Sequence, residues 1–205
     1  MRTKLEVEAK FKIPLGTMDL VTKAIEEVND LNDIYPPCKG LPIEHVYTYH
    51  HYSTDGTRRT MCSEGDTYWY AVRGKTKGYF HKERFLINRK TLDPTSGFDM
   101  EEEGSISKVE FLNSISPTDK CVFKLRKKIT YIGKCYEFDH YGTPRLPYET
   151  LELELDDVDS FNIVMAYFKQ FNTLPLFAQL NIKVPIEDVT FDLSYRNKNL
   201  AVSIS

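Results

Sequence analysis

Residues 4–13 alternate between apolar and charged side chains with a period of two, and this pattern constrains the fold more than any other feature of the chain. The odd positions are apolar from Leu5 to Phe11, while the even positions carry charge, including Glu6, Glu8 and Lys10. Side chains of a β-strand point alternately to the two faces of its sheet. The pattern therefore predicts a strand with one apolar face and one charged face.

Similar patterns recur along the chain and predict several further strands. We expect them at residues 44–53, 57–62, 66–73, 79–91, 120–132, 134–141 and 149–155. Apolar residues at helical spacing predict helices over 17–30 and 157–171, and a short helix is expected within 105–115. Residues 93–105, which contain Pro94 and two glycines, are expected to form an exposed loop. The prediction is an α+β fold over residues 1–205, a single domain in which an eight-stranded antiparallel closed β-barrel carries helices on its outside.

The charged strand faces are sorted by sign. Besides Glu6, Glu8 and Lys10, the sorted runs are Lys82, Arg84, Asn88 and Lys90; Lys124, Arg126 and Lys128; Glu137 and Asp139; and Glu152 and Glu154. If these faces point into a barrel, its interior holds opposed basic and acidic walls. Unpaired buried charge is costly, so such an interior is expected to hold a polyanion and a cation. Basic side chains suit phosphate oxygens, and carboxylates suit Mg²⁺ or Mn²⁺.

Each charged run has a simpler interpretation when taken alone. A Glu-x-Glu-x-Lys pattern is common on solvated strands, and the run from Lys82 to Lys90 could be an edge that charge keeps soluble. Glu152 and Glu154 could be surface partners of Lys124 and Arg126. The combination of five sorted runs in one small domain favours a functional interior.

Bulk composition excludes several classes of protein. With 27 basic and 30 acidic residues the formal charge is −3, which argues against a general nucleic-acid coat protein. No stretch reaches the roughly 18 apolar residues of a membrane span, and the first residues lack the apolar core of a signal peptide. We expect a cytoplasmic protein without a membrane partner, as a monomer or a homodimer. The four cysteines lack CxxC spacing, which argues against a structural zinc site or disulfide framework and favours reduced, buried thiols.

The ordered set of motifs resembles the triphosphate tunnel metalloenzymes, also called the CYTH superfamily. The motifs that carry the resemblance are Glu6-Val7-Glu8-Ala9-Lys10, Lys124-Leu125-Arg126, Glu137-Phe138-Asp139 and Glu152-Leu153-Glu154. The tail over residues 189–201 is similar to the ending of the inorganic triphosphatase branch. The middle departs from the family pattern, because no Arg-x-Arg occurs there: Arg58 and Arg59 are adjacent, and Lys82-Glu83-Arg84 has the nearest spacing.

The resemblance implies an eight-stranded tunnel in which a metal-dependent triphosphatase binds its substrate. It implies substrate-binding roles for Lys10, Arg58, Arg73, Lys82, Arg84, Lys90, Lys124 and Arg126. It implies metal-binding roles for Glu6, Glu8, Asp139, Glu152 and Glu154, of which Glu6, Glu8 and Glu154 would act in catalysis together with Lys10. Glu101 and Glu103 lie where the family has a further acidic motif. The implied cofactor is Mg²⁺ or Mn²⁺, and the implied substrate is tripolyphosphate, ATP or a similar small molecule.

Three alternatives share the same scaffold. A class IV adenylate cyclase would let the ribose hydroxyl attack the α-phosphorus, and an RNA 5′-triphosphatase would act on 5′-triphosphate RNA. A non-catalytic polyphosphate- or nucleotide-binding module is the third. The number of carboxylates argues against the last one, because binding a polyanion does not require them.

Overall fold

The computed structural model describes residues 5–30, 43–52, 58–64, 67–73, 87–89, 101–104, 113, 118–192 and 197–203. Within these ranges, eleven strands belong to a single sheet: β1 (Leu5–Pro14), β2 (Ile43–Tyr52), β3 (Arg58–Glu64), β4 (Thr67–Arg73), β5 (Ile87–Arg89), β6 (Glu101–Gly104), β7 (Lys120–Tyr131), β8 (Lys134–Thr143), β9 (Tyr148–Leu155), β10 (Glu187–Asp188) and β11 (Val202–Ser203). The helices are α1 (Thr17–Asp30), α3 (Val158–Phe171), α4 (Pro175–Gln179) and α5 (Asn197–Leu200). Within the described part of the chain, no helix is long and apolar enough to cross a membrane.

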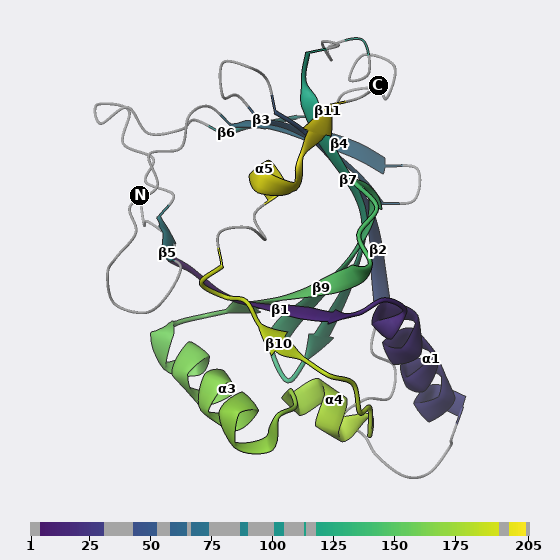
Figure 1. The fold of residues 1–205 in the computed structure, drawn as a ribbon, viewed down its shortest axis with the longest axis vertical. Helices are drawn as coiled ribbons and strands as arrows, with labels where there is room; N and C mark the ends of the chain where they lie inside the picture. Colours follow the sequence, from purple (N-terminus) through teal and green to yellow (C-terminus); the bar gives the residue numbers. More distant parts are fainter. Residues whose placement is uncertain are drawn as a thin grey trace.

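The sheet is antiparallel and curves around a central space. Its strands follow the order β10-β1-β9-β8-β7-β2-β3-β4-β6, with β5 paired to β1 and β11 paired to β7. Figure 1 shows these strands arranged as a ring when viewed end-on, with α5 toward the middle. Among the described residues no hydrogen-bonded ladder joins β6 to the β1 side. The predicted antiparallel sheet with helices is therefore confirmed, whereas closure of the barrel is not seen in the described ladders.

Most of the predicted elements are present. The expected strands near 4–13, 44–53, 57–62, 66–73, 120–132, 134–141 and 149–155 correspond to β1, β2, β3, β4, β7, β8 and β9, and the helices over 17–30 and 157–171 correspond to α1 and α3. Of the strand expected at 79–91 only β5 is described, and of the helix expected at 105–115 only residue 113 is described. The exposed loop expected at 93–105 is wrong at residues 101–104, where β6 pairs with β4. The short elements α4, α5, β10 and β11 were not expected.

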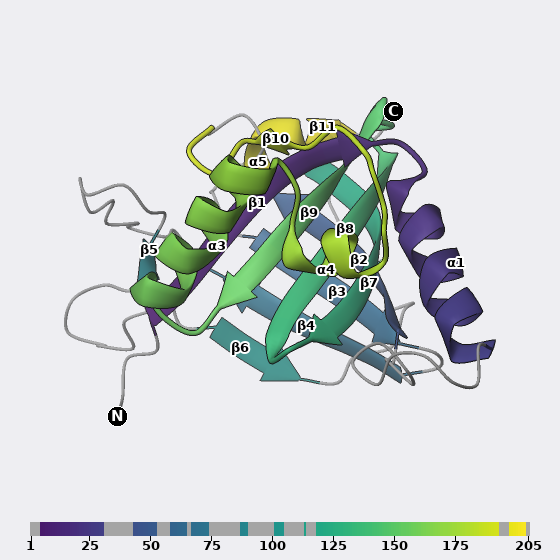
Figure 2. The same ribbon diagram turned by 90° about the horizontal axis from the view of Figure 1, so that it is seen from below.

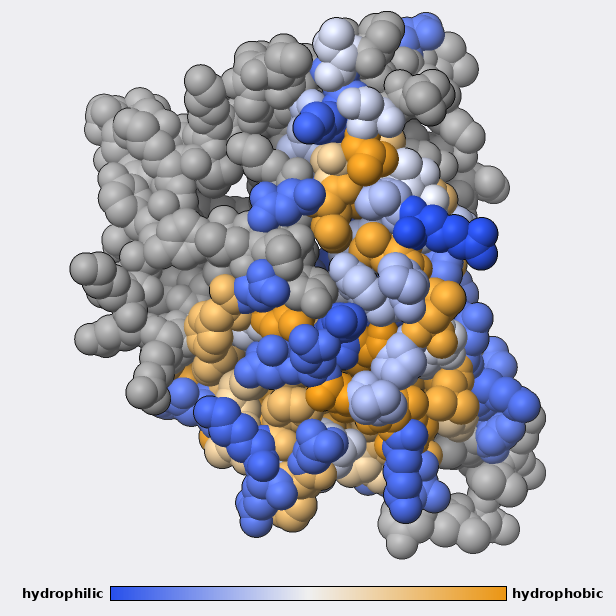
Figure 3. Space-filling view, viewed as in Figure 1, coloured by the Kyte–Doolittle hydropathy of each residue, from blue (hydrophilic) through white to orange (hydrophobic). Residues whose placement is uncertain are grey.

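The outer face of β1, β9 and β8 forms the core with the helices. Figure 2 shows α1, α3 and α4 lying over this part of the sheet. On α3 the buried residues are Phe161, Val164, Met165 and Phe168, which are spaced as one helical stripe. Phe168 meets Phe11 of β1 with ring centroids 5.2 Å apart, and Phe177 of α4 stacks on Phe138 of β8 at 6.1 Å. Figure 3 shows apolar side chains among polar ones on the surface of this part of the molecule. Burial of these side chains is the main force that holds the helices on the sheet.

A two-residue turn fixes the alignment of β7 with β8. Ile132 and Gly133 connect the strands and have positive φ angles of 48° and 68°. Two successive residues with positive φ form the tight hairpin turn whose twist matches that of the strands. Tyr131 therefore lies opposite Lys134, and the ladder continues without a shift to Arg126, which lies opposite Asp139. The turn thus sets which charged residues meet on the inner face.

A buried glutamate holds the beginning of α1 against β9. The carboxylate of Glu149 accepts hydrogen bonds from the backbone N–H groups of Gly16 at 3.1 Å and Met18 at 2.7 Å. These are N-terminal N–H groups that have no partner within the helix, and the negative charge also suits this end of the helix dipole. Asp157 has the same capping function on α3, but in an exposed position, where its side chain accepts from the N–H of Ser160 at 2.7 Å.

The substitution Glu149→Ala should destabilise the protein by about 3 kcal/mol, because it removes two hydrogen bonds to a charged group and leaves a buried N–H without a partner. The matched control Asp157→Ala should cost clearly less, because water can replace its carboxylate. Urea unfolding of the two variants measures the difference. Equal losses would mean that Glu149 does not anchor α1.

Candidate active site on the inner face of the sheet

The register of four adjacent strands assembles a charged site on the inner face. Residues directly opposite each other on paired strands share a face of the sheet. Across β1 and β9, Glu8 lies opposite Glu154 and Lys10 lies opposite Glu152. Across β9, β8 and β7, the opposed pairs are Glu152 with Glu137, Glu137 with Lys128, and Asp139 with Arg126. The sequence prediction that these charged positions share one face is confirmed for these strands.

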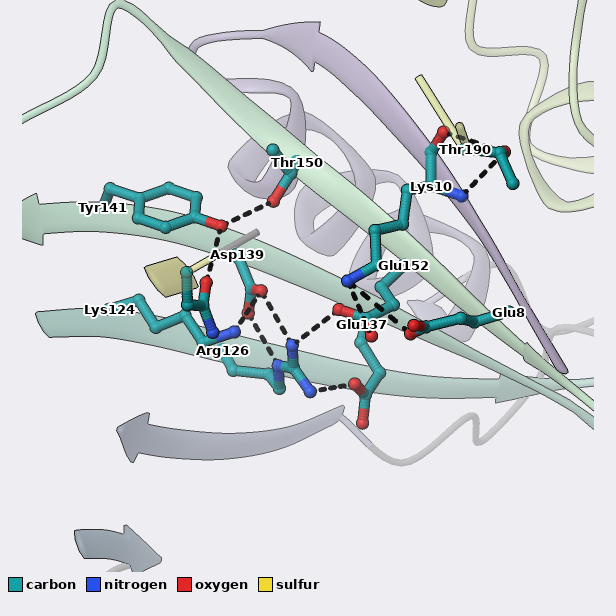
Figure 4. Close-up of polar contacts among 11 residues, drawn as sticks. Glu8, Lys10, Lys124, Arg126, Glu137, Asp139, Tyr141, Thr150, Glu152 and Thr190 are labelled. Atoms are coloured by element: carbon teal, nitrogen blue, oxygen red, sulfur yellow. Dashed lines mark hydrogen bonds and ion pairs between the residues drawn. The ribbon is translucent and has the colours of Figure 1, made fainter. Parts of the chain in front are cut away.

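Arg126 is the centre of the network, since its guanidinium contacts three carboxylates. Its Nε and Nη2 atoms donate to the two oxygens of Asp139 at 2.7 and 2.8 Å, a bidentate arrangement. Nη2 also donates to Glu152 at 3.1 Å, and Nη1 donates to Glu137. Figure 4 shows how these side chains from β7, β8 and β9 point toward one another. The acidic neighbours raise the pKa of Arg126 further above its ordinary value despite burial, so its charge is fixed.

Lys10 links the β1 wall to this network. Its ammonium lies 3.3 Å from Glu152 and 3.6 Å from Glu8. Burial alone would lower the pKa of Lys10, but Glu152 and Glu8 outweigh it and raise that pKa. Burial opposes the negative charge of Glu152 in the same way, but the positive charges of Lys10 and Arg126 hold the Glu152 pKa well below its ordinary value. Lys10 and Glu152 therefore keep opposite charges side by side on the inner face.

Lys124 is the most buried cation of the site, with 2% of its surface exposed. Its ammonium donates to Asp139 at 2.5 Å. Burial and the nearby Arg126 lower the pKa of Lys124, although Asp139 opposes this. Asp139 is buried as well, and Arg126 and Lys124 together lower its pKa. In this structure the Asp139 carboxylate, which the sequence proposed as a metal ligand, is engaged by two cations.

A second group of donors lies farther along β8 and β9. Cys135 faces Glu154 in the register, and Glu137, which is fully buried, makes an ion pair with Lys128 at 2.6 Å. One donor atom each from Cys135, Glu137 and Glu154 lies within 4.8 Å of the other two. Burial and the two glutamates raise the pKa of the Cys135 thiol to about 11. The predicted burial of the cysteines is confirmed for Cys121, whereas Cys135 is only half-buried.

The C-terminal segment adds polar groups to the site that the sequence did not single out. The hydroxyl of Thr190 accepts a hydrogen bond from the backbone N–H of Lys10 at 3.1 Å, and the N–H of Val189 donates to the Lys10 carbonyl at 2.9 Å. Asn197 reaches the hydroxyl of Tyr141 at 3.5 Å. A small cavity lies between these groups, lined by Lys10, Tyr141, Thr150, Leu151, Glu152, Val189 and Asn197. The similarity of the tail to a triphosphatase ending was the available signal, but it gave no position in space.

The remaining predicted residues differ in how far the structure places them. Glu6 lies opposite Asn88, Arg58 lies opposite both Tyr52 and Arg73, and Arg73 lies opposite Glu101. Residues that lie opposite one another on the successive pairs β7–β2, β2–β3, β3–β4 and β4–β6 share a face of the sheet. By this register, Arg58, Arg73 and Glu101 lie on the same face as Lys124 and Arg126. Lys82, Arg84 and Lys90 fall outside the described residues. Their substrate-binding roles stay predictions.

Asp139→Ala should destabilise the protein by about 3–5 kcal/mol, because it leaves the buried cations Lys124 and Arg126 without their shared partner. The matched control is Asp156→Ala, which breaks an exposed ion pair with Lys134 at 2.9 Å and should cost less than about 1 kcal/mol. Chemical denaturation of both variants tests the contrast. A loss for Asp139→Ala as small as that of the control would contradict the network.

Stability should also fall in acid. The folded-state pKa values of Asp139 and Glu152 lie below their ordinary values, so both carboxylates stabilise the folded protein at pH values above roughly 4. That contribution is lost as the pH falls below this range and the folded protein must take up protons. Urea unfolding between pH 7 and pH 3 should show a decline that is shallower in Asp139→Asn. An unchanged slope in the variant would show that Asp139 does not contribute.

The sequence matches no family model and no curated protein. Solved structures, in contrast, match along almost the whole chain. The crystal structure of the inorganic triphosphatase NE1496 aligns with a TM-score of 0.50 and 18% identity, covering 97% of this chain and 95% of that one. A Hippeastrum protein, HpAC1, described as having a dominant triphosphatase activity, aligns with a TM-score of 0.46 and 10% identity over 89% of this chain and 90% of that one.

The triphosphatase of the Mimivirus capping enzyme aligns with a TM-score of 0.45 and 12% identity, covering 87% of this chain and 90% of that one. At these identities a structural likeness establishes the fold and leaves the activity open. The NE1496 alignment confirms, at the level of the fold, the resemblance inferred from the sequence motifs. This chain has the fold of the inorganic triphosphatase NE1496.

Proposed function

We propose that this protein is a divalent-metal-dependent phosphohydrolase that cleaves the terminal phosphate from inorganic triphosphate or a nucleoside triphosphate. The observation that carries the proposal is the site on β1, β9, β8 and β7, where Lys10, Lys124 and Arg126 lie among buried carboxylates on one face of the sheet. Closure of the sheet into an eight-stranded tunnel around the substrate is part of the proposal. The fold shared with an inorganic triphosphatase supports it.

The charges of the site support a role for a metal. In the described part of these four strands, the inner-face cations Lys10, Lys124, Arg126 and Lys128 each contact a carboxylate. A triphosphate entering here would have to compete with these carboxylates for the cations. A divalent cation held by the carboxylates would free the lysines and the arginine to turn toward phosphate oxygens.

The available donors fit Mg²⁺ or Mn²⁺. These ions prefer hard oxygen ligands and are held through a few carboxylates together with substrate phosphates. Glu6, Glu8, Asp139, Glu152 and Glu154 are the proposed ligands. Glu8 is 3% exposed, and Glu154 faces it across the β1–β9 pair, so carboxylates from two strands are available at one place. When bound, the metal would supply Lewis-acid polarisation of a phosphoryl oxygen.

The residues of the chain would then bind and orient the substrate. Lys10, Lys124 and Arg126 would neutralise its phosphate oxygens, and an anion beside Lys124 would offset the burial that lowers the pKa of this lysine. Arg126 is held in place by Asp139, and the Nη1 and Nη2 groups that now donate to Glu137 and Glu152 would donate to a phosphate instead. A carboxylate among Glu6, Glu8 and Glu154 would orient the attacking water. Positioning and charge stabilisation supply most of the rate enhancement in phosphoryl transfer.

The predicted contributions of Arg58, Arg73, Lys82, Arg84 and Lys90 to substrate binding belong to the same proposal. By register, Arg58 of β3 and Arg73 of β4 belong to the same face of the sheet as Arg126. They would complete a basic wall on the side opposite β1. No specific observation favours the cyclase or the RNA triphosphatase, and the products formed from different substrates separate them from the proposed activity.

Glu8→Gln should lower metal-dependent hydrolysis of tripolyphosphate by about 10²-fold or more, because it keeps the shape of the side chain but removes a carboxylate that holds charge in the transition state. Phosphate release in the presence of Mg²⁺ or Mn²⁺ measures the effect. The matched control is Glu187→Gln. It alters an exposed ion pair at 3.1 Å with Lys12, which lies on β1 like Glu8, and it should leave the rate unchanged.

The same assay with ATP and with 5′-triphosphate RNA identifies the substrate. Orthophosphate released from tripolyphosphate or ATP supports the proposal. Formation of cyclic AMP and pyrophosphate from ATP would reject hydrolysis in favour of the cyclase. Full activity of a correctly folded Glu8→Gln variant would reject the assigned site.

A further inference from the structure

Cys135 brings a thiol to the inner face of the sheet, next to two carboxylates. It lies on β8 in the same alternation as Glu137 and Asp139, and opposite Glu154 of β9. The sulfur of Cys135 and one carboxylate oxygen each from Glu137 and Glu154 lie within 4.8 Å of one another. The three residues belong to two hydrogen-bonded strands, so the backbone holds their spacing. The arrangement is a mixed set of one sulfur and two oxygen donors.

The spacing is suitable for one shared metal ion. In a tetrahedral zinc site, sulfur lies about 2.3 Å and oxygen about 2.0–2.2 Å from the ion, which places the donors roughly 3.5 Å from one another. Closing the observed spacing to that value requires side-chain movements on the order of 1 Å. Such movements are rotamer adjustments and need no change in the strands. A fourth position would remain open to water or another ligand.

Glu137 already has a cation beside it at this place. It is 0% exposed, and its Oε1 atom makes no hydrogen bond among the described residues. The ammonium of Lys128 lies 2.6 Å from this oxygen, an ion pair without the directed geometry of a hydrogen bond. A buried carboxylate oxygen requires a positive partner, and Lys128, whose side chain is 33% exposed, can withdraw toward solvent. Lys128 therefore stands where a metal cation could replace it.

We propose that Cys135, Glu137 and Glu154 form a binding site for a thiophilic divalent cation of the Zn²⁺ class, with Lys128 as the competing internal cation. On binding, the Cys135 thiol would release its proton to solvent as the sulfur–metal bond forms, because the thiolate is the ligand. Lys128 would move away with its charge unchanged. The thiolate distinguishes this site from the carboxylate site proposed for Mg²⁺ or Mn²⁺, since soft sulfur ligands favour zinc-like ions over hard ones.

The site has a consequence that rests on the proposed function. Glu154 would be shared with the Mg²⁺ or Mn²⁺ site, so a zinc-like ion bound through Cys135 would withdraw one of the carboxylates proposed for hydrolysis. Zinc would then act as an inhibitor of the Mg²⁺-dependent reaction. The binding itself needs no substrate and can be measured separately from hydrolysis.

Titration of the full-length protein with Co²⁺ alone tests the site directly. Thiolate coordination produces a charge-transfer absorption in the near ultraviolet, which should appear in the wild type and disappear in Cys135→Ser. The matched control is Cys121→Ser, because Cys121 is a buried thiol on β7 beside β11, and it should retain the band. Persistence of the band in a folded Cys135→Ser variant would overturn the proposal.

Lys128→Gln gives a test in the opposite direction. Removing the competing ammonium should tighten Co²⁺ binding by about tenfold, equivalent to about 1.4 kcal/mol, while Glu137→Gln should weaken it. Unchanged or weaker binding in Lys128→Gln would contradict the role of Lys128.

A final measurement requires no variant. Zn²⁺ should protect Cys135 of the wild-type protein from alkylation, as read by mass spectrometry of the peptide that contains it. Rapid alkylation in the presence of Zn²⁺ would reject the site. None of these metal-binding measurements depends on whether tripolyphosphate is hydrolysed. Failure of this site and failure of the proposed function are therefore distinguishable.

Discussion

The bidentate pair between Arg126 and Asp139 is the interaction on which the inner face depends. Two buried charges in this position are tolerable only because they satisfy each other with two hydrogen bonds, and because the remaining groups of Arg126 contact Glu152 and Glu137. A buried ion pair gives little net stability compared with an apolar pair of the same size. Retaining such a network therefore has a cost in stability, which is understandable if the charges serve binding.

The two faces of the same strands perform separate tasks. On β1 the residues Val7, Ala9 and Phe11 are fully buried and pack in the core that α3 and α4 complete, whereas Glu8 and Lys10 face inward. A rigid apolar side holds the backbone of the charged side in place. Placing catalytic groups on strands rather than on loops reduces their freedom to move away from a productive geometry. The helices α3 and α4 thus support the site from the other face of the sheet.

The sequence alone predicted which residues of a strand share a face, but not which residues of neighbouring strands lie opposite each other. A period of two along β1 and β9 predicted that Lys10 and Glu152 each lie on a charged face, since this follows from strand geometry alone. Which residue meets which depends on turns such as Ile132-Gly133 and on the irregularity between Phe123 and Lys124. The bidentate pairing of Arg126 with Asp139 follows from those details, so the sequence could propose Asp139 only as a generic acidic ligand.

Two further features could not be predicted for related reasons. Residues 101–104 (Glu-Glu-Glu-Gly) have a composition that disfavours strands, yet β6 forms because β4 offers a free edge to pair with. Cys135 looked like a core thiol because strand-like surroundings usually mean burial. Its parity with Glu137 places it on the inner face instead, and this assignment requires knowing which face of β8 the helices cover.

The described parts of the C-terminal segment bind the first and the last of the four strands that carry the site. β10 pairs with β1 at Phe11, the hydroxyl of Thr190 accepts from the backbone N–H of Lys10, and β11 pairs with β7 at Cys121. In Figure 1, α5 lies on the inner side of the ring. The separation of the backbone at Lys10 from that at Arg126 is set by the ladders that join β1, β9, β8 and β7. A polyanion bound between these cations would therefore meet groups whose backbone positions were determined before it bound.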